Sequence, residues 1–243
     1  MMFARLLRPG TEGAFESVAR SHVGRVRAVN EDRLLNRPDR ALWAVADGMG
    51  GHFGGDVAAE TAIAALRRLA DGRRRIGTTG VTAALADANA DIHLRARAAH
   101  GTCGTTIVVA HVDGATLHLW WAGDSRAYLV RRDSARLLTT DHTLVQELVA
   151  AGALDADAAR HHPRANVVTR ALGVEPAVRL DHLALTIDEG DRVLLCSDGL
   201  SKSLSDGDMA GDGEALDSQA DGLLARALER DGSDNISLVL IAA

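Results

Sequence analysis

The chain has 243 residues, of which 47% are hydrophobic and 25% are charged, as in an ordinary globular protein built from one large domain or two small ones. Its net charge is -6, and its longest basic run is Arg73-Arg74-Arg75, so we expect no nucleic-acid-binding surface. Lys202 is the only lysine and it follows Ser201, which excludes a phosphate-binding loop of the Gly-Lys type.

The cysteines and the apolar runs indicate in which cellular compartment the protein is expected. Cys103 and Cys196 are the only two cysteines, too few for a disulfide scaffold, and the apolar run around Cys196 predicts a buried thiol. The N-terminal segment lacks the apolar stretch of a signal peptide, and no run approaches the ~20 apolar residues of a membrane span. We therefore expect a cytoplasmic protein that does not bind membranes.

Strand-like and helix-like segments alternate in blocks along the chain. Short apolar runs predict strands, and apolar residues at helical spacing predict helices. In chain order we expect strands at 23–29 and 41–46, helices at 56–70 and 81–99, strands at 105–112, 116–122 and 127–131, a helix at 141–150, strands at 183–187 and 192–197, a helix at 214–229, and a strand at 236–241.

Turn residues indicate how these elements connect. Asp113-Gly114, between two predicted strands, is typical of a β-hairpin. Asp141 is predicted to cap the N-terminus of its helix, and Gly152 to end that helix. Strands grouped into hairpins, with helices between the groups, favour antiparallel sheets covered by helices over a parallel βαβ sheet.

Acidic residues fall where the predicted strands begin or end. Asp47, Asp124 and Asp198 each follow an apolar run or its closing glycine, and Asp234 precedes the last strand. If these strand ends meet, several carboxylates share a small volume, which is costly because like charges repel and burial disfavours each anion. Bound cations compensate for this, and oxygen ligands favour Mg²⁺, Mn²⁺ or Ca²⁺. The alternative is that each residue is an ordinary turn aspartate.

Two further features belong to the same pattern. Glu31 and Asp32 form an acidic pair, and Arg27 lies just before them in the same strand-like segment. A guanidinium beside a metal cluster is suited to binding a pair of phosphate oxygens. The alternative for Arg27 is an ordinary surface arginine.

Seven motifs occur in the order that they have in a known family. They are GRVRAVNED at 24–32, VADGMGGH at 45–52, GTT at 104–106, AGDSR at 122–126, LTTDH at 138–142, LCSDGL at 195–200 and DNI at 234–236. Over residues 21–241 the chain resembles the PPM-type protein phosphatases, also called the protein phosphatase 2C family, in their bacterial form.

The resemblance implies an α+β fold, a four-layer α-β-β-α sandwich of two antiparallel sheets flanked by helices. It implies a single phosphatase domain over residues 21–243, after an N-terminal extension of residues 1–20. The implied activity is that of a protein-serine/threonine phosphatase, which hydrolyses phosphoserine and phosphothreonine by direct attack of a metal-activated water at a dinuclear centre of Mn²⁺ or Mg²⁺. The implied partners are phosphorylated proteins and a eukaryotic-like bacterial Ser/Thr kinase that the enzyme opposes in signalling. We expect the enzyme to be a monomer.

The resemblance also assigns roles to individual residues. The implied metal ligands are, in chain order, Glu31, Asp47 as the bridge between two ions, the carbonyl of Gly48, Asp124 at a third and weaker site, Asp198 and Asp234. Arg27 would bind the phosphate, Asp32 would orient bound water from behind the ligands, and Asn235 would support Asp234. Arg27, Asp32 and Asp47 are thus the implied catalytic residues.

The proton donor for the leaving group is less well marked. Eukaryotic members place a histidine directly after the Asp-Gly pair, whereas this chain has Met49 there, like the bacterial members. His52 lies close by and is a candidate general acid, with a bound water as the alternative. His161 and His162 fall where bacterial members have a mobile flap, and we expect them to have surface or packing roles.

Two competing readings lead to different chemistry. Cysteine-based phosphatases need Cys-x₅-Arg, but Val109 stands at that spacing from Cys103, and Lys202 from Cys196, so neither cysteine qualifies. The other alternative is a catalytically silent scaffold of the same fold that binds phosphoproteins. It predicts affinity for metal and phosphate without hydrolysis.

Overall fold

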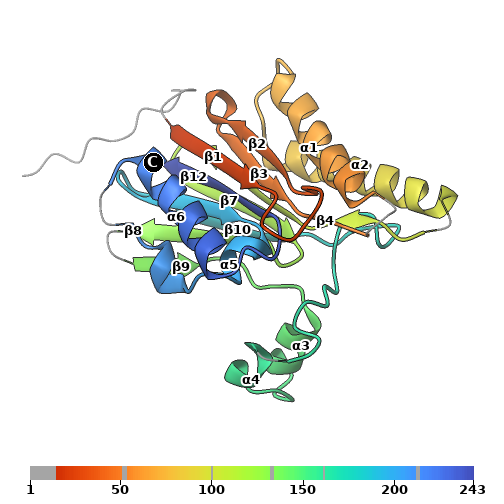
Figure 1. Cartoon of the computed structure of the whole chain (residues 1–243). Helices are drawn as coiled ribbons and strands as arrows, with labels where there is room; N and C mark the ends of the chain where they lie inside the picture. Colours follow the sequence, from red (N-terminus) through yellow and green to blue (C-terminus); the bar gives the residue numbers. More distant parts are fainter. Residues whose placement is uncertain (1–14, 51–53, 100, 132–133, 161, 212–213) are drawn as a thin grey trace, which may run out of the picture.

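The computed structural model describes residues 15–50, 54–99, 101–131, 134–160, 162–211 and 214–243. These residues form two five-stranded sheets stacked face to face, with helices on both outer faces (Figure 1). Neighbouring strands of both sheets pair in antiparallel fashion. The four-layer α+β sandwich expected from the sequence is therefore confirmed.

The first sheet brings together strands from the two ends of the chain. Its strand order is β1-β12-β11-β8-β9. The bounds are β1 (Glu16–His22), β12 (Ile236–Ala242), β11 (Arg192–Cys196), β8 (Arg126–Arg131) and β9 (Ser134–Leu137).

The second sheet is built around a hairpin. Its strand order is β10-β7-β6-β3-β2. Asp113 pairs with Thr116 at the end of the β6–β7 ladder, and Gly114 turns the chain with a φ of 63°, which confirms the hairpin predicted there. The bounds are β10 (Asp181–Thr186), β7 (Thr116–Ala122), β6 (Ile107–Asp113), β3 (Leu42–Ala46) and β2 (Arg33–Arg37).

Helices cover the outer faces of the sandwich. Helices α1 (Gly55–Asp71) and α2 (Thr78–Ala98) pack on the second sheet, and α6 (Leu216–Arg230) packs on the first. None of the helices in the described ranges combines the length and the hydropathy needed to cross a bilayer.

In Figure 1, α3 (Leu144–Ala150) and α4 (Ala156–Arg160) project away from the sheets. Short elements of the described residues are α5 (Asp198–Ser201), the strand pair β4 (Gly48–Met49) and β5 (Gly104–Thr105), and the 3-10 helices η1 (Pro38–Arg40) and η3 (Asp206–Met209).

Alternation along the central strands supplies three hydrophobic cores. In β3, Trp43 and Val45 point between the sheets, whereas Ala44 faces α1 and α2. In β11, Leu195 points between the sheets and Leu194 faces α6. Strands that are buried on both faces read as nearly continuous apolar runs, which is why the sequence revealed them.

The strand predicted at 23–29 does not form. Strand β1 ends at His22, and the next residues make a turn and a loop. Gly24 has a φ of 83°, and a Cβ there would lie 2.2 Å from the carbonyl oxygen of Asp234, so the chain turns tightly against the start of β12. Val26 and Val29, which suggested a strand, are 73% and 59% exposed.

The predicted cap at Asp141 is also wrong. Helix α3 begins at Leu144, and the side chain of Thr143 accepts the capping hydrogen bond from the Gln146 backbone N–H. Asp141 instead forms an ion pair with Arg126 at 2.7 Å, because β8 places that guanidinium beside it. The helix ends at Ala150, and Gly152 follows with a φ of 69°, as expected of a glycine that ends a helix.

Strand β1 begins within the segment predicted to be an N-terminal extension. It pairs with β12 along its whole length, from Glu16 opposite Ala242 to His22 opposite Ile236. The strand lies at the sheet edge and is mostly polar and partly exposed, so its sequence lacks the apolar run that marks the central strands.

Candidate metal centre

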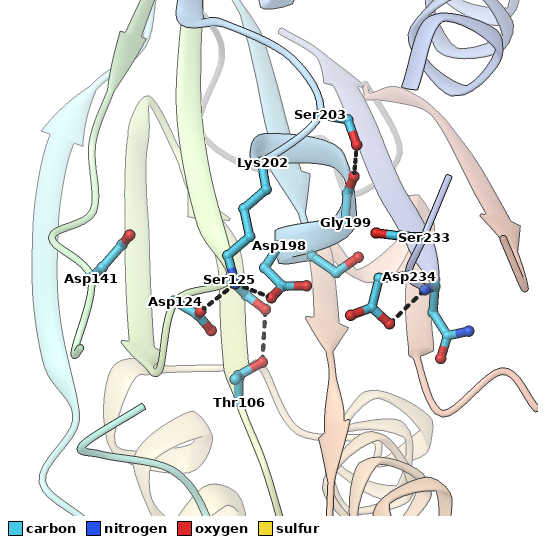
Figure 2. Close-up of polar contacts among 12 residues, drawn as sticks. Thr106, Asp124, Ser125, Asp141, Asp198, Gly199, Lys202, Ser203, Ser233 and Asp234 are labelled. Atoms are coloured by element: carbon cyan, nitrogen blue, oxygen red, sulfur yellow. Dashed lines mark hydrogen bonds and ion pairs between the residues drawn. The ribbon is translucent and has the colours of Figure 1, made fainter. Parts of the chain in front are cut away.

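A pocket of about 330 Å³ opens where several strands end. Arg27, Gly48 and Asn235 are among the residues that line it. Five acidic side chains that the sequence singled out also line this pocket: Glu31, Asp47, Asp124, Asp198 and Asp234. Figure 2 shows three of them, Asp124, Asp198 and Asp234, lying near one another. Segments far apart in the sequence thus bring their carboxylates to one place.

The GTT motif holds Asp47 at the end of β3. The backbone N–H of Thr106 and the hydroxyl of Thr105 both donate to the Asp47 carbonyl oxygen, each at 2.9 Å. The Asp47 backbone N–H donates in return to the Thr106 hydroxyl at 3.2 Å. These contacts fix the direction in which the chain leaves the strand, and with it the position of the carboxylate.

Asp198 and Asp124 are set by close packing of their neighbours. Asp198 follows β11 and begins α5. A Cβ on Gly199 would lie 2.0 Å from the carbonyl oxygen of Asn235, so only glycine lets α5 sit this close to β12. Asp124 follows β7 and is 4% exposed, and the hydroxyl of the next residue, Ser125, lies 2.7 Å from that of Thr106. That hydrogen bond joins the loop carrying Asp124 to the motif that holds the end of β3.

Asn235 anchors the loop that carries Glu31. Its side-chain oxygen accepts from the Glu31 backbone N–H at 2.8 Å, and its amide donates to the carbonyls of Val23 at 2.9 Å and Val29 at 3.0 Å. Its contact with Asp234 is made by its backbone N–H, which donates to the carboxylate at 2.8 Å. The side chain therefore acts on the loop, and the main chain acts on Asp234.

Asp32 lies behind the pocket and is 3% exposed. The Ser197 hydroxyl donates to Oδ2 at 2.9 Å, whereas Oδ1 is buried and has no hydrogen-bond partner among the described residues. Burial raises the pKa of Asp32 to about 7, against the opposing effect of the nearby Ser237 and Ser197 hydroxyls. A buried carboxylate oxygen without a partner is a place for an ordered water.

Burial, together with neighbouring carboxylates, raises the pKa values of Glu31, Asp47 and Asp124 in the pocket. Burial raises the pKa of Asp47 well above its ordinary value, and the neighbouring charges of Asp198, Asp32 and Asp124 add to this effect. Burial likewise raises the pKa of Asp124 to about 6 and raises that of Glu31. The pocket therefore strongly favours cations, which would relieve the repulsion among its carboxylates.

Two protein cations already neutralise part of this charge. Arg27 Nη2 lies 2.8 Å from Asp234 Oδ2, and Lys202 Nζ lies 2.5 Å from Asp198 Oδ2. No ion pair of the described residues includes Asp47. Among the described residues, Asp47 and Glu31 are therefore the pocket carboxyls without a protein cation as an ion-pair partner.

The donor set fits a hard divalent cation. Carboxylate and carbonyl oxygens are the ligands that Mg²⁺ and Mn²⁺ prefer. In the described part of the chain, no three Asp, Glu, His or Cys side chains are already arranged around one ion position. The fit therefore rests on donor type, on the charge around Asp47 and on the unpaired oxygen of Asp32.

Without divalent cations, Asp32 and Asp124 should each contribute less stability to the protein as the pH rises from about 5 to about 8. Asp32, with a pKa of about 7, and Asp124, with a pKa of about 6, hold their protons more tightly in the folded chain than at the ordinary value of 3.8. This stabilisation is complete below the unfolded-state pKa and is lost as the pH rises through the folded-state values. Thermal unfolding in EDTA should show the decline, and Asp32→Asn should reduce its slope. The same dependence of the melting temperature on pH in the wild type and Asp32→Asn would contradict the prediction.

Two pocket residues come from the segment that includes α3 and α4. Asn166 and Val168 line the pocket, and the sequence did not reveal them because neither adjoins a predicted strand or carries a charge. The base of the segment is tied to β10, since Asp181 Oδ1 lies 2.6 Å from Arg170 Nη1 and Asp181 Oδ2 lies 3.3 Å from His142 Nε2. The position of this segment thus helps to shape one wall of the pocket.

Of the three histidines that the sequence singled out, only His162 lies among the described residues. His52 and His161 lie outside the described residues, so a general acid at His52 stays a prediction. His162 is partly buried in a turn, where its Nδ1 accepts from the Arg164 backbone N–H at 3.1 Å.

Comparisons with known proteins agree with the geometry. The family model described as protein phosphatase 2C matches residues 12–148. The serine/threonine phosphatase stp of Listeria innocua is 35% identical over 240 residues, which cover 91% of this chain and 93% of that protein.

Solved structures give the same picture. The crystal structure of the Mycobacterium tuberculosis serine/threonine phosphatase PstP/Ppp matches with a TM-score of 0.85 and 35% identity, covering 94% of this chain and 98% of that one. A structure of the PstP catalytic domain in complex with 2 manganese ions matches with a TM-score of 0.83 and 34% identity, covering 94% and 97%. The chain belongs to the protein phosphatase 2C family and is a protein phosphatase.

Proposed function

We propose that this protein removes phosphate from phosphoserine and phosphothreonine in other proteins, using Mn²⁺ or Mg²⁺ held by the carboxylate pocket. The observation that carries the proposal is the meeting of five acidic side chains from separate segments in one pocket of about 330 Å³, with Arg27 in its lining. The bacterial relatives named serine/threonine phosphatases, and the PstP structure with 2 manganese ions, support the substrate class and the metal.

The ions would be held around Asp47. We propose that Asp47 is shared between two ions, with Asp198 and Asp234 as further ligands of one ion and Glu31 and the Gly48 carbonyl as further ligands of the other. Asp124, which the resemblance assigned to a third and weaker site, instead pairs with Lys202 Nζ at 3.4 Å. When bound, two divalent cations stabilise charge on the phosphate oxygens and supply a nucleophile at neutral pH. Asp32, whose Oδ1 is unpaired, would accept a hydrogen bond from a water held behind the ligands.

Arg27 would bind the phosphate group. The Arg27 side chain is 54% exposed and uses Nη2 to bind Asp234, which orients the guanidinium toward the pocket. Among the described residues, no carboxylate binds its remaining N–H groups, which can donate to two phosphate oxygens at once. Asp234 therefore serves to position Arg27 as well as to bind an ion.

The pairing of the first and last strands supports a proposal for the extent of the catalytic domain. We propose one phosphatase domain that starts with β1 and ends with β12, because these strands pair along their whole lengths. We further propose that the enzyme opposes a bacterial Ser/Thr kinase and acts as a monomer. The silent scaffold is less well supported, since every acidic position of the pocket is present.

A phosphothreonine peptide tests the proposal. Hydrolysis should require Mn²⁺ or Mg²⁺, stop in EDTA, and fall by at least ~100-fold in Asp198→Asn, because loss of a metal ligand should cost more than the ~10–100-fold typical of residues behind the ligands. Asp87→Asn, on the exposed side of α2, is the matched control and should keep wild-type activity. Protein that binds Mn²⁺ and yet never hydrolyses the peptide would favour the scaffold instead.

A further inference from the structure

Lys202 places an ammonium group among the pocket carboxylates. It is the only lysine of the chain and caps the C-terminal end of α5, one helical turn after Asp198. Its Nζ lies 2.5 Å from Asp198 Oδ2 and 3.4 Å from Asp124 Oδ2. Figure 2 shows the side chain extending toward both carboxylates. One side chain thus bridges acidic groups that come from two distant segments.

Within the described residues, Lys202 is the only cation that forms an ion pair with Asp124. Arg126, which lies close by in the sequence, is bound to Asp141 through hydrogen bonds of 2.9 Å and 2.7 Å. Asp124 is only 4% exposed, so solvent ions screen it poorly. Compensation of this buried carboxylate therefore falls to Lys202.

We propose that Lys202 is a resident cation at Asp124, which fills the position of a third, weaker divalent ion and confines the divalent ions to the side of the pocket around Asp47. The inference rests on the metal centre of the proposed function. Asp198 can serve both sides, because Lys202 binds its Oδ2 and a carboxylate has a second oxygen that can bind an ion.

Physical chemistry favours the ammonium over an ion at this position. An ammonium is a compact charge with three donors, enough for two carboxylates at once. It is attached to the chain, so its local concentration does not depend on the supply of metal. A divalent ion that approached within about 4 Å of it would meet a strong like-charge repulsion.

The test counts the Mn²⁺ ions bound per chain by equilibrium dialysis. The variants are Lys202→Met, which keeps the length without the charge, Lys202→Arg, which keeps the charge, and Lys202→Met combined with Asp124→Asn. We expect Lys202→Met to bind one Mn²⁺ more than the wild type and Lys202→Arg to match the wild type. The double variant should lose the additional ion.

Thermal unfolding in EDTA provides a second readout that does not depend on activity. Lys202→Met should melt at a lower temperature than the wild type, because Asp124 and Asp198 lose their shared cation, and adding Asp124→Asn should restore part of the loss. Equal Mn²⁺ counts in the wild type and Lys202→Met, or an additional ion that persists in the double variant, would overturn the proposal. A wild type that binds no Mn²⁺ would instead overturn the proposed metal centre itself.

Discussion

Asp47→Asn is expected to lower metal-dependent phosphatase activity by at least ~100-fold and, in EDTA, to raise the melting temperature. The activity falls because an amide is a much weaker ligand than the carboxylate proposed to join two ions, and even residues behind metal ligands account for ~10–100-fold. The stability rises because the substitution removes one charge from a group crowded by Asp198, Asp32 and Asp124. Peptide hydrolysis and thermal unfolding measure the two effects.

Lower activity together with a higher melting temperature distinguishes a residue of the metal site from a residue that only supports the fold. Asp91→Asn, at an exposed position of α2, is the control and should change neither quantity. If Asp47→Asn lost activity and stability together, the loss would reflect a damaged fold. If it kept its activity, Asp47 would not hold the ions.

Asn235→Ala is expected to reduce the free energy of unfolding by about 2–4 kcal/mol and to weaken Mn²⁺ binding. The side chain makes three hydrogen bonds to the loop of residues 23–31 and is 6% exposed, so its removal leaves buried backbone groups unpaired, at about 1–3 kcal/mol for such a group. The loop carries Arg27 and Glu31, so its release should also displace a metal ligand and the phosphate-binding guanidinium. Denaturant unfolding and Mn²⁺ titration measure these effects.

Asn89→Ala is a closely matched control. Asn89 is also buried, and it makes the same kind of contacts, accepting from Gly173 N–H and donating to the carbonyls of Glu175 and Pro176, but it does not line the pocket. It should lose a similar amount of stability and keep its Mn²⁺ affinity. Equal losses of Mn²⁺ affinity in the two variants would show that Asn235 has no special role in placing the loop.

Much of the fold and most of the acidic site could be predicted because local patterns report burial. The central strands are buried on both faces, so β3, β11 and β12 appear in the sequence as apolar runs. Asp47 and Asp198 are recognisable because each directly follows such a run. Strands at the edge of a sheet are harder to recognise in the sequence. Strand β1 was missed because its side chains are mostly polar and partly exposed.

The sequence by itself determined which carboxylates could form a site, and only the tertiary structure decided what neutralises them. Nothing around Lys202 in the sequence connects it with Asp124, which lies 78 positions away, and their contact depends on how α5 sits against the end of β7. Asp141 was expected to cap a helix, but β8 places Arg126 beside it, and the carboxylate forms an ion pair with that guanidinium instead. Local patterns record whether a residue is buried, whereas the pairing of charges depends on which distant segments the stacked sheets bring together.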